Sequence, residues 1–151
     1  MIYVEAHGAR IPALGLGTFR LEGSTARRMV GYALEIGYRH IDTAQMYGNE
    51  REVGAAIASS AVPRADIWLT TKIWPDNFRN DALQRAADRS VRTLGTVPDL
   101  LLLHWPNPSV PLAETVRALN AARRRGLARH IGISNFTVAL IREARALSED
   151  P

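Results

Sequence analysis

The sequence predicts an α/β fold in which the strands of one parallel sheet alternate with helices. Three observations predict it. Short apolar runs with strand character recur five times, and each is followed by a segment with the apolar spacing of a helix. One run, Leu100 to Leu103, is four leucines in succession, which is typical of a parallel strand buried on both faces. The composition, 46% hydrophobic and 23% charged over 151 residues, is that of one globular domain spanning residues 1–151.

The first elements are a small hairpin, a short strand and a helix. Residues 2–12 fit two strands joined by a turn at His7 and Gly8, and residues 13–18 form the next strand. The helix begins at Ser24, a residue type that caps helix N-termini, and ends at Gly37. Its buried face is given by apolar residues three and four positions apart: Ala26, Met29, Val30, Ala33 and Leu34.

The later elements continue the alternation. A strand from Tyr38 to Ile41 stops at Asp42 and opens into a loop that carries Tyr47. Asn49 begins the next helix, and Glu52 three residues later completes the pattern of a capping box. The remaining elements are expected in this order: strand 67–72, helix 82–94 ended by Gly95, strand 99–104, a helix from Pro111 to Gly126, strand 129–134 and a helix from Thr137.

This alternation predicts a parallel (β/α)8 TIM barrel, in which functional residues lie at the C-terminal ends of the strands. A doubly wound dinucleotide-binding fold is disfavoured, because Gly15-Leu16-Gly17 lacks the third glycine of its phosphate-binding turn. A complete barrel takes about 250 residues. The chain is therefore expected to hold about five of the eight units, as a truncated barrel preceded by the hairpin.

The composition also excludes several classes of protein. The chain has no cysteine, which excludes disulfides and cysteine metal sites. It shows no signal-peptide core and no apolar run long enough for a bilayer, so we expect a soluble cytoplasmic protein without a membrane partner. The net charge is +4, but the densest basic cluster, Arg123 to Arg125, lies at a predicted helix end, where cations complement the helix dipole. Without interleaved aromatic residues, no nucleic-acid partner is expected.

Four polar residues lie at or just after successive strand ends: Asp42, Tyr47, Lys72 and His104. Lys72 is the single lysine beside 18 arginines, at a position where a compact ammonium suits and a guanidinium does not. An ammonium beside a tyrosine favours the phenolate and makes the phenol a better proton donor. Together the four residues suit protonation of a carbonyl oxygen that becomes an alkoxide, with a hydride supplied by a cofactor.

Each of these residues alone also fits a structural role. An aspartate after a strand is usually a turn or cap residue, a histidine in an apolar strand is usually a core residue, and a tyrosine usually packs. Their joint placement at successive strand ends favours the catalytic interpretation. No metal site is predicted, because His104 and Asp42 have no third ligand at suitable spacing.

Four motifs resemble those of the aldo-keto reductases, in the order of that family: Gly37 to Glu50, Thr70 to Trp74, Leu103 to Pro106 and Ile131 to Phe136. The segment Ile11 to Arg20 is similar to that of bacterial members of the 2,5-diketo-D-gluconate reductase type, which also reduce methylglyoxal. The resemblance covers essentially the whole chain. It implies reduction of small aldehydes and ketones by NADPH.

The resemblance also implies roles for individual residues. The catalytic residues would be Tyr47 as general acid, Lys72 as its activator, Asp42 as the partner of Lys72 and His104 as the donor that orients the substrate. The cofactor would be bound by Gly17, Thr18, Asp42, Ser134 and Asn135. The substrate pocket would be formed by Phe19, Trp74, His104 and Trp105.

The resemblance implies that part of the cofactor site is missing. In this family, later strands supply the ring stacked on the nicotinamide and the residues that bind the 2′-phosphate. A sheet cut after five units would also expose the edges of its first and fifth strands. We therefore expect a complementing chain or self-association, with a catalytically incompetent fragment or a non-enzymatic binding module as the alternatives.

Overall fold

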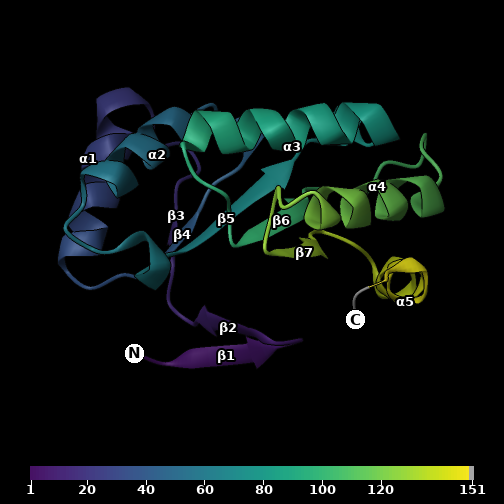
Figure 1. The fold of residues 1–151 in the computed structure, drawn as a ribbon, viewed down its shortest axis with the longest axis horizontal. Coiled ribbons are helices and arrows are strands. Elements are labelled where there is room, and N and C mark those ends of the chain that lie inside the picture. Colours follow the sequence, from purple (N-terminus) through teal and green to yellow (C-terminus); the bar gives the residue numbers. More distant parts are fainter. Residues whose placement is uncertain (150–151) are drawn as a thin grey trace.

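A five-stranded parallel sheet forms the centre of the computed structural model, which describes residues 1–149 (Figure 1). The strands lie side by side in chain order: β3 Leu16–Gly17, β4 His40–Asp42, β5 Trp68–Ile73, β6 Leu100–Leu103 and β7 His130–Ile133. All four pairings are parallel, so the C-terminal ends of the strands meet at one edge. β3 and β7 are the outer strands, as expected for an open sheet.

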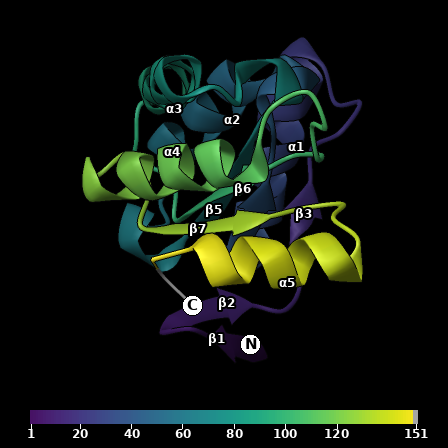
Figure 2. The ribbon, with the colours of Figure 1, turned by 90° about the vertical axis from the view of Figure 1, so that its right-hand side faces the viewer.

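Five helices follow the five strands and cover the outer side of the sheet (Figures 1 and 2). They are α1 Gly23–Glu35, α2 Glu50–Ser59, α3 Asn80–Leu94, α4 Leu112–Arg124 and α5 Val138–Leu147. Three short 3-10 turns, Gln45–Tyr47, Arg64–Asp66 and Pro75–Asn77, lie in the connections. No helix between residues 1 and 149 combines the length and the apolar character needed to cross a bilayer.

The N-terminal hairpin is separate from the main sheet. Strands β1 Tyr3–Ala6 and β2 Ala9–Pro12 pair antiparallel, and His7 and Gly8 form the turn with positive φ angles of 47° and 78°. The hairpin lies beneath the N-terminal ends of the strands (Figure 1), where Tyr3 and Pro12 line a cavity of about 490 Å³ with Trp68 and His130.

The core lies between the outer face of the sheet and the helices. One apolar cluster joins α1 and α2 to β4 and β5, and a second joins α3 and α4 to β5 and β6. Gly54 permits close approach of α2 to α3, because a Cβ atom there would lie 2.3 Å from the carbonyl oxygen of Leu94. These clusters fix the helices that carry the loops at the C-terminal edge.

The inner face of the sheet is less covered than the sequence predicts. Leu101 and Leu103 point outward and are fully buried, whereas Leu100 and Leu102 point inward and are only partly buried. The prediction that this strand is buried on both faces is therefore wrong. The five strands do not close on themselves, so the inner leucines are only partly covered.

One predicted helix cap is misplaced, and one predicted capping box is absent. Glu22 rather than Ser24 occupies the N-cap of α1, and it makes no side-chain capping bond. Asn49 does precede α2, but its side chain does not bond the first turn of the helix, so Asn49 and Glu52 form no capping box. By contrast, Thr137 caps α5 as expected, since its side chain accepts a hydrogen bond from the Leu140 amide.

Candidate active site

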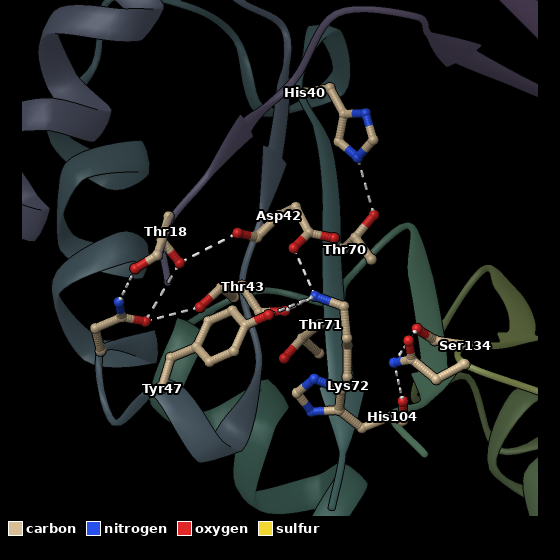
Figure 3. Close-up of polar contacts among 12 residues, drawn as sticks. Thr18, His40, Asp42, Thr43, Tyr47, Thr70, Thr71, Lys72, His104 and Ser134 are labelled. Carbon is tan, nitrogen blue, oxygen red and sulfur yellow. Dashed lines mark hydrogen bonds and ion pairs between the residues drawn. The ribbon is translucent and has the colours of Figure 1, made fainter. Parts of the chain in front are cut away.

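Tyr47 lies at the C-terminal edge of the sheet, at the end of a 3-10 turn that follows β4. Gly48 comes next with φ 67°, a left-handed conformation that suits glycine, and α2 begins two residues later. Figure 3 shows the phenol directed across the sheet edge toward the end of β5, where Lys72 points to the same side. The turn thus brings a loop residue over the ends of two strands.

The ammonium of Lys72 has three partners, which use all three of its N–H donors. Lys72 Nζ lies 2.5 Å from Asp42 Oδ1, 3.0 Å from the Thr43 carbonyl oxygen and 3.3 Å from the Tyr47 hydroxyl (Figure 3). Because the ammonium has no acceptor, the phenolic oxygen must accept this hydrogen bond. The hydroxyl proton of Tyr47 therefore remains free to point toward a ligand.

His104 follows β6 and completes the group. Its ring lies edge-on to Tyr47, with ring centroids 5.7 Å apart, and edge-on to Trp74 at 5.4 Å. Burial lowers the pKa of His104, and the nearby Lys72 charge lowers it further, so the ring is neutral at pH 7. Nδ1 of His104 is buried without a hydrogen-bond partner among residues 1–149, so no bond at that atom fixes the tautomer of the ring.

The aromatic residues predicted to form the pocket surround this group unequally. Phe19 is 53% exposed, and its ring centroid lies 5.1 Å from that of Tyr47. Trp74 packs against His104 on the other side. Trp105 is 48% exposed and makes no ring contact with the other aromatic side chains of residues 1–149. Phe19 and Trp74 therefore border Tyr47 and His104, whereas Trp105 is held by no aromatic neighbour.

The residues predicted to bind a cofactor lie along the same edge. Gly17 is open, since a Cβ atom there would meet nothing within 4 Å, so a ligand can approach its backbone. Asn135 adopts a positive φ of 62° and donates its Nδ2 to the His104 carbonyl oxygen and to Ser134 Oγ. Its Oδ1 atom remains available as an acceptor for a carboxamide N–H. These groups fit a nicotinamide.

Sequence reasoning missed a second layer of residues that holds this group. Asn49, predicted as a helix cap, is buried and donates Nδ2 to the carbonyl oxygens of Thr18 at 2.8 Å and Leu21 at 2.9 Å. Its Oδ1 accepts from Thr43 Oγ1 at 2.8 Å, and the Thr43 carbonyl is a partner of Lys72. The signal available in the sequence was a polar pair, Asn49 and Glu50, between Tyr47 and a helix.

Comparison with known proteins gives a consistent picture. The model of the aldo/keto reductase family matches residues 13–151. The methylglyoxal reductase DkgB of Salmonella typhi is 50% identical over 139 residues, which cover 90% of this chain and 52% of that protein. An aldo-keto reductase of Mycolicibacterium smegmatis is 47% identical over 131 residues, covering 85% and 48%.

Solved structures agree in fold. A protein provisionally assigned as 2,5-diketo-D-gluconic acid reductase B superposes with a TM-score of 0.96 at 55% identity, over 99% of this chain and 53% of that one. An aldo-keto reductase of Bombyx mori, solved in complex with NADP, gives a TM-score of 0.84 at 37% identity, over 94% and 52%. The chain belongs to the aldo/keto reductase family. It spans about half the length of the curated relatives it matches.

Proposed function

We propose that this chain carries the proton-transfer half of an NADPH-dependent reductase that converts small aldehydes and ketones to alcohols. The observation that supports this most is the hydrogen bond from Lys72 Nζ to the Tyr47 hydroxyl, combined with the ion pair from Lys72 to Asp42. A phenol that accepts from an ammonium and keeps its own proton free is arranged to act as an acid.

In this proposal Tyr47 gives its proton to the carbonyl oxygen as that oxygen gains negative charge. The Lys72 ammonium stabilises the phenolate that remains, and Asp42 holds the ammonium in place. The neutral His104 ring donates a hydrogen bond to the same oxygen and orients the substrate. NADPH, when bound, supplies the hydride, and Gly17, Thr18, Asp42, Ser134 and Asn135 would hold it.

The substrates proposed are small carbonyl compounds. The similar proteins are named for methylglyoxal and for 2,5-diketo-D-gluconic acid, both small carbonyl compounds. Phe19 and Trp74 give the region around Tyr47 an apolar border, with Trp105 further out at the surface. Such a border suits a short, weakly polar substrate.

We also propose that activity requires a second segment, which supplies three more β-α units. Three units are the difference between this sheet and the eight strands of a barrel. Apolar residues are exposed at both ends of the open sheet, Tyr32 and Ile36 on or next to α1, and Val138 and Ile141 on α5. A segment that pairs with β7 and returns to β3 would cover both patches.

The test is NADPH oxidation with methylglyoxal, by the chain alone and by the chain joined to the remaining half of a DkgB relative. We expect little turnover by the chain alone and clear turnover by the joined protein.

Tyr47→Phe in the joined protein should abolish reduction and leave NADPH binding intact, because the substitution removes only the hydroxyl. Full activity of Tyr47→Phe would refute the proposed acid. A wild-type joined protein that binds NADPH without turnover would favour a binding module.

A further inference from the structure

Glu50 is a buried carboxyl that the proposed reaction does not use. It is the first residue of α2 and is only 8% exposed. Among residues 1–149 it forms no ion pair, and its Oε1 accepts a hydrogen bond from Thr71 Oγ1 at 2.6 Å. Burial raises the pKa of this carboxyl, against the hydrogen bond from Thr71 and the nearby charge of Arg89, which lower it. Burying a carboxyl group costs free energy, so its position in the interior indicates a specific role.

Glu50 lies three residues after Tyr47, and its hydrogen bond leads to the residue before Lys72. Thr71 directly precedes Lys72 on β5, and the two side chains point to opposite faces of the sheet. The 3-10 turn that ends at Tyr47 is anchored to α3, because Gln45 Nε2 donates to Ser90 Oγ at 2.9 Å and to the Ala86 carbonyl oxygen at 2.8 Å.

Glu50 therefore ties the start of α2, three residues after Tyr47, to β5 beside Lys72. Thr71 fixes the backbone of β5 beside Lys72, and Gln45 fixes the 3-10 turn that ends at Tyr47. The 3.3 Å contact between Lys72 Nζ and the Tyr47 hydroxyl joins the same two elements on the other side of the sheet. A shift of the turn against the strand would break that contact without disturbing the fold around it.

We propose that Glu50 is a positioning residue that sets the contact between Lys72 and Tyr47, through its hydrogen bond from Thr71 on one side and its place three residues after Tyr47 on the other. The catalytic meaning of this contact rests on the proposed function. The position of Lys72 can be tested without it. Because Lys72 is the single lysine, its ε-amine and the α-amine of Met1 are the two amines that an acylating reagent can modify.

The experiment measures the rate of acetylation of Lys72 by acetic anhydride, relative to Met1, by peptide mass spectrometry at low urea. In the wild-type chain Lys72 is 7% exposed and fully hydrogen bonded, so we expect slow modification. Loss of the buried hydrogen bond in Glu50→Ala should speed modification of Lys72 by roughly tenfold or more. Glu50→Gln keeps an acceptor for Thr71 and should lie between. Thr71→Val removes one bond and gives a second, milder variant.

The controls separate a local shift from general loss of stability. Leu119→Ala creates a cavity in the core beneath α4, in an apolar cluster that does not include Glu50, and serves as a variant of comparable or greater instability. Glu52→Gln changes charge on the same helix without touching the network. If Lys72 in Glu50→Ala and Thr71→Val is modified no faster than in Leu119→Ala, the proposal is wrong. This readout needs neither a cofactor nor turnover. It therefore tests the position of Lys72 even if Tyr47 is not the acid of the reaction.

Discussion

At the scale of single residues, hydrogen bonding determines the protonation state of the histidine His40. Trp68 Nε1 can only donate, and it donates to Thr70 Oγ1 at 3.2 Å. The Thr70 hydroxyl is therefore free to donate to His40 Nε2 at 3.1 Å, and His40 Nδ1–H donates to the Pro12 carbonyl oxygen at 3.2 Å. His40 thus ties the hairpin to the inside of the sheet as a neutral ring.

This arrangement predicts a pH dependence of stability. Burial lowers the pKa of His40 below its ordinary value of 6.5, and burial also lowers that of His104. The unfolded chain then binds more protons than the folded one, so stability is complete above about pH 6.5 and falls as the pH drops below it. Urea unfolding at pH 7.5 and 5.5 should show a lower midpoint at pH 5.5, and His40→Gln should reduce the difference.

The raised pKa of Glu50 acts in the opposite direction. Its contribution is complete below the ordinary value of 4.5 and is lost as the pH rises through the higher folded value. Glu50→Gln should therefore enlarge the difference between pH 7.5 and 5.5 that His40→Gln reduces. A difference between the two midpoints that His40→Gln leaves unchanged would contradict the neutral state of His40.

The four residues of the site were predictable from the sequence, but the contacts that support them were not. Asp42, Tyr47, Lys72 and His104 were predicted to gather, because parallel strands place their C-terminal ends together, and they do. The role of Asn49 was not predicted. Its partners Thr18 and Leu21 are distant in sequence, and a helix cap was the simpler interpretation of an asparagine at that position.

At the scale of elements, the contact of α2 with α3 depends on one glycine. Gly54→Ala would place a Cβ atom 2.3 Å from the backbone oxygen of Leu94, which cannot move aside as a side chain could. We expect a loss of about 1–3 kcal/mol in the free energy of unfolding from this overpacking. Thermal or urea unfolding measures it directly.

Gly31 in α1 is the matched control. A Cβ atom there meets nothing within 4 Å, and alanine favours a helix over glycine by about 0.5–1 kcal/mol. Gly31→Ala should therefore stabilise the chain while Gly54→Ala destabilises it. Equal effects of the two substitutions would mean that α2 and α3 are not packed at the distance described.

The helices and strands themselves were largely predictable, because their apolar spacing reflects burial against the sheet. The exceptions have physical causes. The first strand of the sheet was expected over residues 13–18 but pairs with β4 only at Leu16 and Gly17. The inner leucines of β6 were expected to be buried, and the open sheet leaves them partly exposed.

At the scale of the whole molecule, the open sheet predicts a response to a complementing segment. A separate polypeptide carrying the remaining three β-α units of a DkgB relative should raise the urea midpoint of this chain in a concentration-dependent manner. Binding to the folded state adds about 2.7 kcal/mol when the segment is present at 100 times its dissociation constant.

An unrelated helical protein of similar size is the control for crowding. A midpoint that does not respond to the DkgB segment would contradict the proposal that the exposed ends of the sheet receive further units.

The hairpin has a consequence for synthesis on the ribosome. Ala6, His7 and Ile11 line one cavity with Leu100, His130 and Ile131, so the earliest part of the chain docks onto the latest strand. Some 120 residues must therefore emerge before the first ten find their place, and such distant partners slow folding. During translation the hairpin has no docking surface until β7 has been synthesised. A nascent chain stalled before β7 would keep its N-terminus accessible to proteases and chaperones.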